Sequence, residues 1–278
     1  MCWRMCVLLS LISIAEAHSD PWGDIHPQVL VVDGKFSIVF NSSQPKKVSE
    51  FTEGKPILQM IYTVEGKLFA PRHPLERKRS HQETGPVGLY GRKTHLDEST
   101  LIFQENRSGY LLKSPEGKIT RVRLPWPKNV SPSFLEDVLV VSEGIAMTGK
   151  EMSSAQDGGP LKFYWFDHDS TDAPVVLTIG KTACIYHFPV ASNVAFAGGR
   201  FWVAYMRPTE NEKFKLSLWS WKPGDKEGRV EDLDSPADWN SHLSIAAIGD
   251  HLCLAYHCVT DHQYPGSARI VTVFRKTK

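Results

Sequence analysis

The segment 251–262, HLCLAYHCVTDH, concentrates side-chain types that bind soft metal ions. Alternate residues of an extended strand point to the same face, so His251, Cys253 and His257 are expected to share one face. Imidazole and thiolate groups are typical zinc ligands, but these spacings follow no established zinc motif. We therefore predict a β-strand with no metal and no other cofactor, and we keep these three residues as the candidate ligands.

Two aspartates, Asp20 and Asp24, precede the first strand-like apolar stretch of the chain. Hydrolysis of a glycosidic bond uses two carboxyl groups about 5–10 Å apart, so either aspartate is a candidate for one of them. The partner would come from elsewhere in the chain. Four acidic residues lie near predicted strand ends, and spacing selects none of them over their alternative role as turn residues: Glu143, Asp167, Asp169 and Asp250.

A third group of residues is suited to binding by stacking and hydrogen bonding. Aromatic side chains offer flat apolar faces, and arginine offers a planar fork of donors for a carboxylate. The alternative is that the rings form the core between strands. The candidate binding residues are Trp165, Tyr205, Arg207, Trp219 and Trp221.

The balance of charge excludes some functions. The chain has 278 residues with 32 basic and 31 acidic side chains, and its formal net charge is +1. This near-neutrality gives no general attraction to nucleic acids. The sequence also contains no phosphate-binding glycine loop and no Gly-x-Ser-x-Gly motif, so nucleotide chemistry and serine hydrolase chemistry are not indicated.

Residues 1–17, MCWRMCVLLSLISIAEA, have the pattern of a secretory signal peptide. A single arginine precedes an apolar run, and the segment ends in Ala-Glu-Ala. The run is shorter than the roughly 20 residues that cross a bilayer. We expect cleavage near Ala17, a mature chain from His18 without a membrane span, and a secreted or periplasmic location.

Cleavage would leave three cysteines, Cys184, Cys253 and Cys258. The odd number argues against a disulfide scaffold. Cys253 and Cys258 are expected on opposite faces of one strand, so a bridge, if one forms, would join Cys184 to one of them. Asn41, Asn106 and Asn129 begin glycosylation sequons, which matter only if the protein is eukaryotic.

Two stretches of the chain are alike. VAFAGGRFWVAY (194–205) and IAAIGDHLCLAY (245–256) lie 51 positions apart, and each has apolar runs on both sides of a glycine turn. This pattern is typical of a β-hairpin. Related hairpin patterns occur at 29–40, 61–70, 110–124 and 138–147, and further strands are expected at 162–166, 213–221 and 269–274.

Units of about 50 residues with about four strands each indicate an all-β protein, a β-propeller of five blades. Six blades or a β-sandwich are the alternatives. The units begin near residues 27, 80, 133, 185 and 241, in a single domain over 18–278. The last unit has three strands, so residues 18–27 or the strand 29–32 are expected to complete it. Helical turns near 46 and 132 are the only helical structure expected.

The start of the expected mature chain, HSDPWGDIHPQVLVVDGKFSIVF, is similar to the opening of five-bladed glycoside hydrolases and sialidase-like propellers. That resemblance implies a site at the central channel with carboxylates from different blades. The Ser-x-Asp-x-Gly-x-x-Trp turns of sialidases are missing, which argues against that branch.

We predict a secreted monomer that binds a carbohydrate or protein through loops on one face, and not an enzyme. The first alternative is a glycan-acting hydrolase that uses inward-facing carboxylates. The second is a structural cell-envelope protein. Two carboxyls and an arginine at one channel end would favour the hydrolase, and a channel lined by alanine, valine and aromatic residues would favour binding.

Overall fold

The computed structural model describes residues 24–42, 57–74, 93–97, 100–106, 109–113, 118–123, 134–150, 159–168, 173–182, 192–208, 214–233, 239–259 and 268–277. The predicted signal peptide, Asp20, Asp169, Cys184, Asn129 and the possible helical turn near residue 46 lie outside these ranges. No helix occurs in the described part of the chain, so no segment there could cross a bilayer as a helix.

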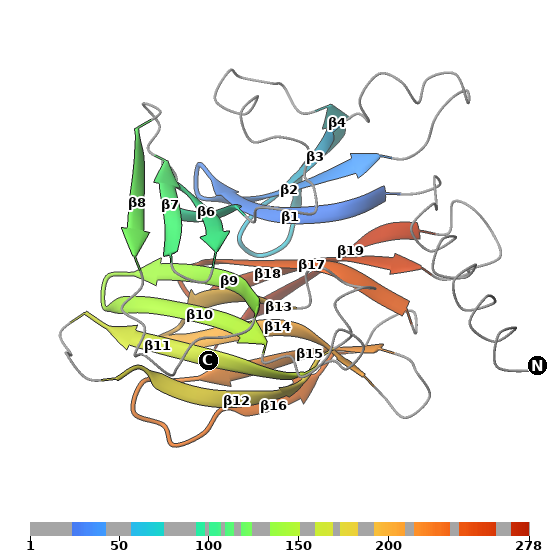
Figure 1. Cartoon of the computed structure of the whole chain (residues 1–278). Helices are drawn as coiled ribbons and strands as arrows, with labels where there is room; N and C mark the ends of the chain where they lie inside the picture. The colour runs from blue at the N-terminus through green and yellow to red at the C-terminus, as the bar shows by residue number, and fades with distance from the viewer. Residues whose placement is uncertain are drawn as a thin grey trace, which may run out of the picture.

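The described strands form five antiparallel sheets, each made of strands that follow one another in the sequence (Figure 1). The first two sheets contain β1 (Asp24–Val32), β2 (Lys35–Ser42), β3 (Ile57–Tyr62) and β4 (Leu68–Pro74), then β5 (Lys93–Asp97), β6 (Thr100–Asn106), β7 (Gly109–Lys113) and β8 (Ile119–Arg123). The third contains β9 (Phe134–Val141), β10 (Gly144–Lys150), β11 (Pro160–Asp167) and β12 (Val175–Lys181). The last two contain β13 (Ser192–Ala197), β14 (Arg200–Pro208), β15 (Phe214–Trp221) and β16 (Arg229–Asp232), then β17 (Trp239–Ile248), β18 (His251–Val259) and β19 (Ala268–Lys276).

Tight turns set the register of the first hairpins. Asp33 and Gly34 have φ of 50° and 65°, and Gly198 and Gly199 have φ of 59° and 71°. Two consecutive residues at positive φ form the primed turn that matches the twist of antiparallel strands. The two similar stretches of the sequence form hairpins: 194–205 lies in the β13–β14 hairpin and 245–256 in the β17–β18 hairpin.

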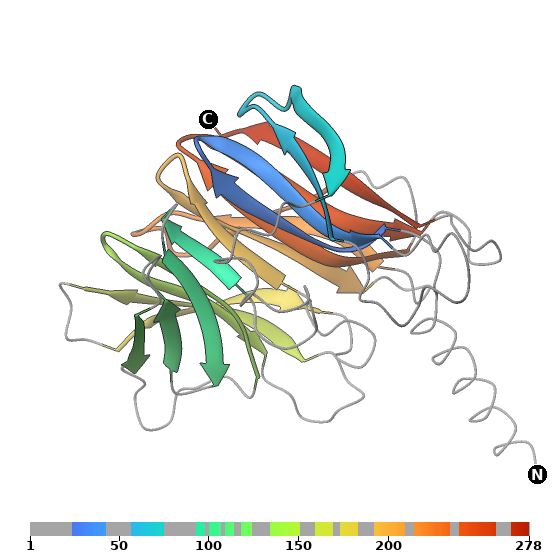
Figure 2. The same cartoon turned by 90° about the horizontal axis from the view of Figure 1, so that it is seen from above.

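The first strands of the five sheets contact one another in a closed cycle: β1 with β5, β5 with β9, β9 with β13, β13 with β17, and β17 with β1. Figure 2 shows the first and the fifth sheet, at the two ends of the chain, lying side by side. This arrangement is the predicted five-bladed β-propeller. The ring has two faces. The first strands of the sheets begin toward the strand-start face, the side of Asp24, Glu136 and Ser192. The opposite side, the turn face, carries the hairpin turns at 33–34, 142–143, 198–199 and 249–250.

Apolar side chains fill the spaces between the third and fourth, the fourth and fifth, and the fifth and first sheets. Between the third and fourth sheets the core is aromatic: the Phe163 ring lies 5.0 Å from Trp219 and 5.4 Å from Phe201 between centroids. Between the fourth and fifth sheets it contains Leu218 and Leu254 among others. Neither face of a single sheet could be buried without its neighbours, which is why the sheets form a ring.

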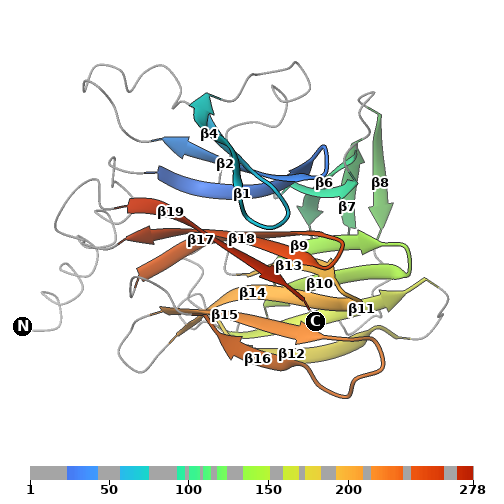
Figure 3. The same cartoon turned by 180° about the vertical axis from the view of Figure 1, so that it is seen from behind.

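Two fold predictions are wrong. The strand 29–32 belongs to β1 and pairs with β2, so this alternative does not complete the fifth sheet, whose described part has three strands. Of the other alternative, residues 18–27, the part 24–27 also belongs to β1, and 18–23 lie outside the described residues. The segment from residue 134 is a strand and not a helical turn, because its apolar residues pair along β10. The first and fifth sheets, which lie next to each other in Figure 3, are instead joined by side chains, among which Phe274 packs against Phe36 and Tyr62.

Replacement of Phe274 by alanine tests this junction. Because the half-buried ring packs between the first and the fifth sheet, we expect Phe274→Ala to lower the free energy of unfolding by about 2–3 kcal/mol. The matched control is Phe69→Ala, since Phe69 is 62% exposed on β4 and its loss should change stability by less than about 0.5 kcal/mol. Urea unfolding measures both; equal effects would contradict the role of Phe274 at the junction.

Candidate functional site

A cavity of about 200 Å³ lies on the axis of the ring. Its walls come from the first strands β1, β9, β13 and β17, and most of the lining side chains are apolar. The polar exceptions are Asn193 and Ser244. The middle of the channel therefore offers a ligand little to hydrogen-bond, and polar chemistry must be sought at its ends.

Side chains link the first strands of the third, fourth, fifth and first sheets in turn, by hydrogen bonds to backbone amides. The amide of Val194 donates to Asp137 Oδ2 at 2.8 Å, and the amide of Ile245 donates to Asn193 Oδ1 at 2.7 Å. The amide of Val29 donates to Ser244 Oγ at 3.0 Å. A first strand is the edge of its sheet, so these amides have no ladder partner within it and need a side-chain acceptor.

The three acceptors occupy the same place in their strands. Asp137, Asn193 and Ser244 each lie four residues before the last paired residue of the strand, Val141, Ala197 and Ile248 respectively. In each case the acceptor directly precedes the apolar run of a hairpin. That single polar residue was the sequence signal for this set, and the sequence analysis did not use it.

A cluster of buried charged and hydroxyl groups adjoins this set on the strand-start face. Lys150 Nζ lies 2.7 Å from Glu136 Oε1, and the two side chains are 1% and 0% exposed. Ser192 Oγ lies 2.5 Å from Glu136 Oε2 and 2.9 Å from Thr148 Oγ1. Asn193 Nδ2 also donates to Asp137 Oδ2, at 2.5 Å. The third and fourth sheets are thus joined by a continuous polar network.

Asp24, one of the two candidate aspartates, begins β1 and pairs with Ser42 at the strand-start face. Asp137, which pairs with Thr148, lies near the middle of β9, at the strand position that Gln28 occupies in β1, four residues after Asp24. The acidic residues considered as partners lie elsewhere: Glu143 and Asp250 are in turns and Asp167 pairs with Gly144, all on the turn face. Seven steps of about 3.3 Å separate the two ends of such a strand, so these three cannot pair with Asp24.

The candidate aromatic residues lie in the core. Trp165, Tyr205, Trp219 and Trp221 are at most 5% exposed and belong to the cluster between the third and fourth sheets. Their ring faces contact other side chains, so the structure offers no open stacking surface at these positions.

Arg207, the fifth candidate binding residue, differs because its side chain is 41% exposed. It lies at the strand-start end of β14, and its Nη2 donates to Asp232 Oδ2 at 2.6 Å. Ser217 Oγ donates to Asp232 Oδ1 at 2.8 Å. Burial raises the pKa of Asp232, but these two hydrogen bonds together with the positive charges of Arg207 and Lys215 outweigh it and leave the pKa below its usual value. Arg207 Nε is buried and has no hydrogen-bond partner in the described part of the chain.

The candidate metal ligands do not converge. His251 and His257 are six residues apart on β18, or roughly 20 Å along the strand, whereas zinc holds its ligands at about 2 Å. His251 Nδ1 lies 2.8 Å from Asp250. Burial raises the pKa of the Cys253 thiol, which opposes formation of the thiolate that binds metals. No group of three potential ligands occurs among the described residues.

Cys253 and Cys258 face different cores, as predicted from their spacing. Cys253 packs toward the first sheet and Cys258 toward the fourth. A bridge between these two is therefore excluded, and the pairing of Cys184 stays a prediction.

Comparison with known proteins identifies the fold. No protein-family model and no curated protein matches the sequence. Among solved structures, the α-L-arabinofuranosidase CtGH43 of Clostridium thermocellum matches with a TM-score of 0.51 and 14% identity, over 89% of this chain and 88% of that one. The similarity to five-bladed glycoside hydrolases, expected from the opening of the sequence, is confirmed at the level of the fold.

Two further matches are looser. The catalytic domain of a GH62 α-L-arabinofuranosidase from Coprinopsis cinerea has a TM-score of 0.47 and 12% identity, over 92% of this chain and 91% of that one. The GH43_1 enzyme from Xanthomonas citri in complex with xylotriose has a TM-score of 0.48 and 11% identity, over 91% and 87%.

The buried ion pair gives a first test of the site. Because Lys150→Met leaves the Glu136 carboxylate buried without its cation, we expect a loss of about 3–5 kcal/mol in the free energy of unfolding. The double variant with Glu136→Leu should recover part of that loss, since it leaves no uncompensated charge. Lys226→Met, on an exposed loop, is the control. Denaturant unfolding that ranks the double variant below Lys150→Met would contradict this account.

The pH dependence of stability tests the Arg207–Asp232 pair. A carboxyl with a lowered pKa contributes stability above the pKa of the unfolded chain, and the contribution disappears as the pH falls through the folded pKa. We therefore expect Arg207→Met to destabilise the protein slightly at neutral pH, by about 1 kcal/mol or less, and by nothing well below pH 3. Thermal unfolding across this range measures it, with Arg72→Met as the control. A difference that persists at the acid end would show that Arg207 acts by packing and not by charge.

Proposed function

We propose that the protein is a secreted, glycan-acting glycoside hydrolase whose site lies at the strand-start face of the channel. The observation that carries this proposal is the placement of Asp24 and Arg207 toward the strand-start ends of β1 and β14. The buried Asp137 lies about four residues deeper along its strand and adds a second carboxylate below this face. An arginine and carboxylates toward one channel end favour hydrolysis over binding. The fold shared with an arabinofuranosidase supports the same choice and makes arabinofuranosides the first substrates to test.

Asp24 is the reacting carboxylate in this proposal. It acts as base on water or as nucleophile, while a second carboxyl protonates the leaving oxygen. Asp137 does not react: both donors on its Oδ2 hold it as a fixed negative charge. Such a charge stabilises the positive charge that develops on the sugar in the transition state, because it needs no reorganisation during the reaction. Arg207, through Nε, positions a sugar hydroxyl.

A carbohydrate-binding module is the second candidate, and two observations favour it. The channel cavity is lined mostly by apolar side chains. Glu136 and Asp137 are almost fully buried, so a substrate could not touch them without a rearrangement. In that case the same face would bind a glycan and release it unchanged.

The decisive experiment exposes the mature protein to a glycan panel that includes α-L-arabinofuranosides, with released sugars identified by mass spectrometry. We expect release of one sugar type and its loss in Asp24→Asn, by about 10²–10⁴-fold, the range for a group that transfers protons in the reaction. Asp33→Asn, in the β1–β2 turn on the opposite face, is the control. Azide should restore turnover to Asp24→Ala as a glycosyl azide if Asp24 is the base or nucleophile.

Binding of a glycan with no released sugar would support the module instead. If Asp24→Asn releases sugar as fast as the unchanged protein, the proposed hydrolase activity stands, but the proposed role of Asp24 is overturned. An absence of both binding and release would count against glycans.

A further inference from the structure

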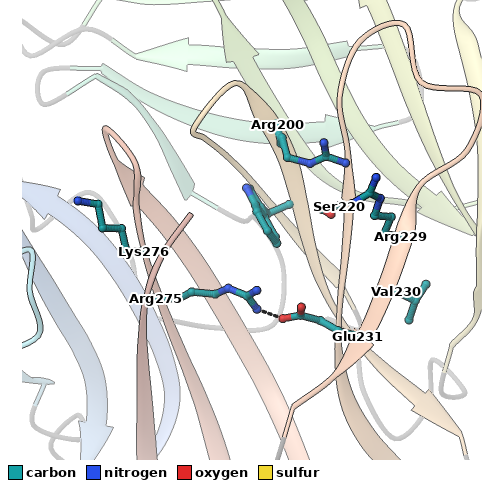
Figure 4. A pocket seen from close by; sticks show the side chains of 8 residues that line it. Arg200, Ser220, Arg229, Val230, Glu231, Arg275 and Lys276 are labelled. Atoms are coloured by element: carbon teal, nitrogen blue, oxygen red, sulfur yellow. Dashed lines mark ion pairs between the residues drawn. The ribbon is translucent and has the colours of Figure 1, made fainter. Parts of the chain in front are cut away.

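A second and larger cavity lies on the turn face, between the fourth and fifth sheets (Figure 4). Its volume is about 370 Å³, within the range of about 300–1,000 Å³ of small-molecule sites. It lies at the opposite end of the strands from Asn193. The lining residues come from β14, β15, β16 and β19: Arg200, Trp202, Ser220, Arg229, Val230, Glu231, Arg275 and Lys276.

The lining is strongly cationic although the protein as a whole is nearly neutral. Three arginines and one lysine line the cavity together with one carboxylate, Glu231. Two more carboxylates lie just outside the lining: Asp225 contacts Arg200, and Asp250 lies 3.6 Å from Lys276.

In Figure 4 the side chains of Arg200 and Arg229 project toward the same part of the cavity, away from the Arg275–Glu231 pair. Cations gathered in a concave site raise the local concentration of anions. The site therefore selects for a negatively charged ligand.

One arginine is held rigidly. Arg275 forms an ion pair with Glu231, and its guanidinium carbon lies 5.3 Å from the centre of the Trp202 ring. That ring is itself fixed, because Trp202 Nε1 donates to the carbonyl of Ala197 at 3.1 Å. Arg275 and Glu231 thus join the two sheets and form a preformed wall of the cavity.

The other two arginines are available to a ligand. Arg229 is exposed and has no ion-pair partner in the part of the chain that the structure describes. Arg200 contacts Asp225 at 3.3 Å, and Asp225 is 41% exposed and can turn toward solvent. A ligand carboxylate can pair with these two guanidinium groups without displacing Glu231 from Arg275.

We propose that this cavity is a non-catalytic binding site for an acidic sugar, a uronic acid residue of a glycan. A planar carboxylate fits the donor fork of arginine, and it carries one negative charge, which the nearby Glu231 tolerates better than the two charges of a phosphate. The Ser220 hydroxyl and the outer oxygen of Glu231 offer partners for sugar hydroxyls. The site anchors an acidic chain on the face opposite the proposed active site, and it stands whether or not that face is catalytic.

The test is isothermal titration of the mature protein with an oligogalacturonate of defined length. We expect binding that weakens as salt is added, and no binding of the neutral galactose oligomer of the same length. Arg229→Gln should weaken binding about tenfold or more, as expected for loss of a charge-assisted hydrogen bond. Arg229→Lys should give an intermediate loss, because it keeps the charge and loses the fork.

Arg72→Gln, an exposed arginine on β4, is the matched control and should bind as the unchanged protein does. Tighter binding of a sulfated oligosaccharide would overturn the choice of a carboxylate, and equal binding by Arg229→Gln would overturn the site. Cleavage of neutral glycans in the same samples reports separately on the strand-start face, so failure of one proposal is distinguishable from failure of the other.

Discussion

The innermost strand of every sheet in a propeller presents an unpaired edge to the channel, and this constraint governs the rest of the structure. Buried amides without an acceptor are costly. Here the acceptors are side chains of the preceding sheet, at one repeated strand position: Asp137 serves Val194, Asn193 serves Ile245, and Ser244 serves Val29. Because each bond joins equivalent positions, the bonds also fix how far neighbouring sheets are shifted along the channel.

Once that shift is fixed, side chains of adjacent sheets interleave in one way. Phe163 of the third sheet reaches Phe201 and Trp219 of the fourth, and Leu218 of the fourth shares a core with Leu254 of the fifth. The same reasoning covers the junction of the first and fifth sheets, which relies on packing around Phe274. The aromatic residues that the sequence suggested as ligand-binding surfaces are therefore buried in the core between sheets.

The sequence predicted the fold well because strand alternation and turn chemistry are local. Asp33–Gly34 and Gly198–Gly199 specify their hairpins without help from distant residues. The site was predicted less well because it depends on which strand ends meet in the ring. Asp24 stays a candidate chosen from its place before a strand. Asp137 and Glu136 lie inside a segment that also fits a helical turn, and only the pairing of β9 with β10 shows that they belong to a first strand. Spacing in the sequence selected none of Glu143, Asp167 and Asp250, and the structure places all three on the turn face.

The buried charges next to Asp137 indicate why this end of the channel differs from the rest. A buried ion pair such as Glu136–Lys150 contributes no more stability than well-packed apolar residues would, and often less. Selection for stability alone would favour apolar residues in place of this pair, like those that line the middle of the channel. What the pair provides is geometry: Glu136 accepts from Ser192 on β13, and the adjacent Asp137 accepts from Asn193 on the same strand. Charges that are held rigidly at a cost in stability are the form that electrostatic preorganisation takes, and these charges lie on the strand-start side of the apolar channel, the side on which the reaction is proposed.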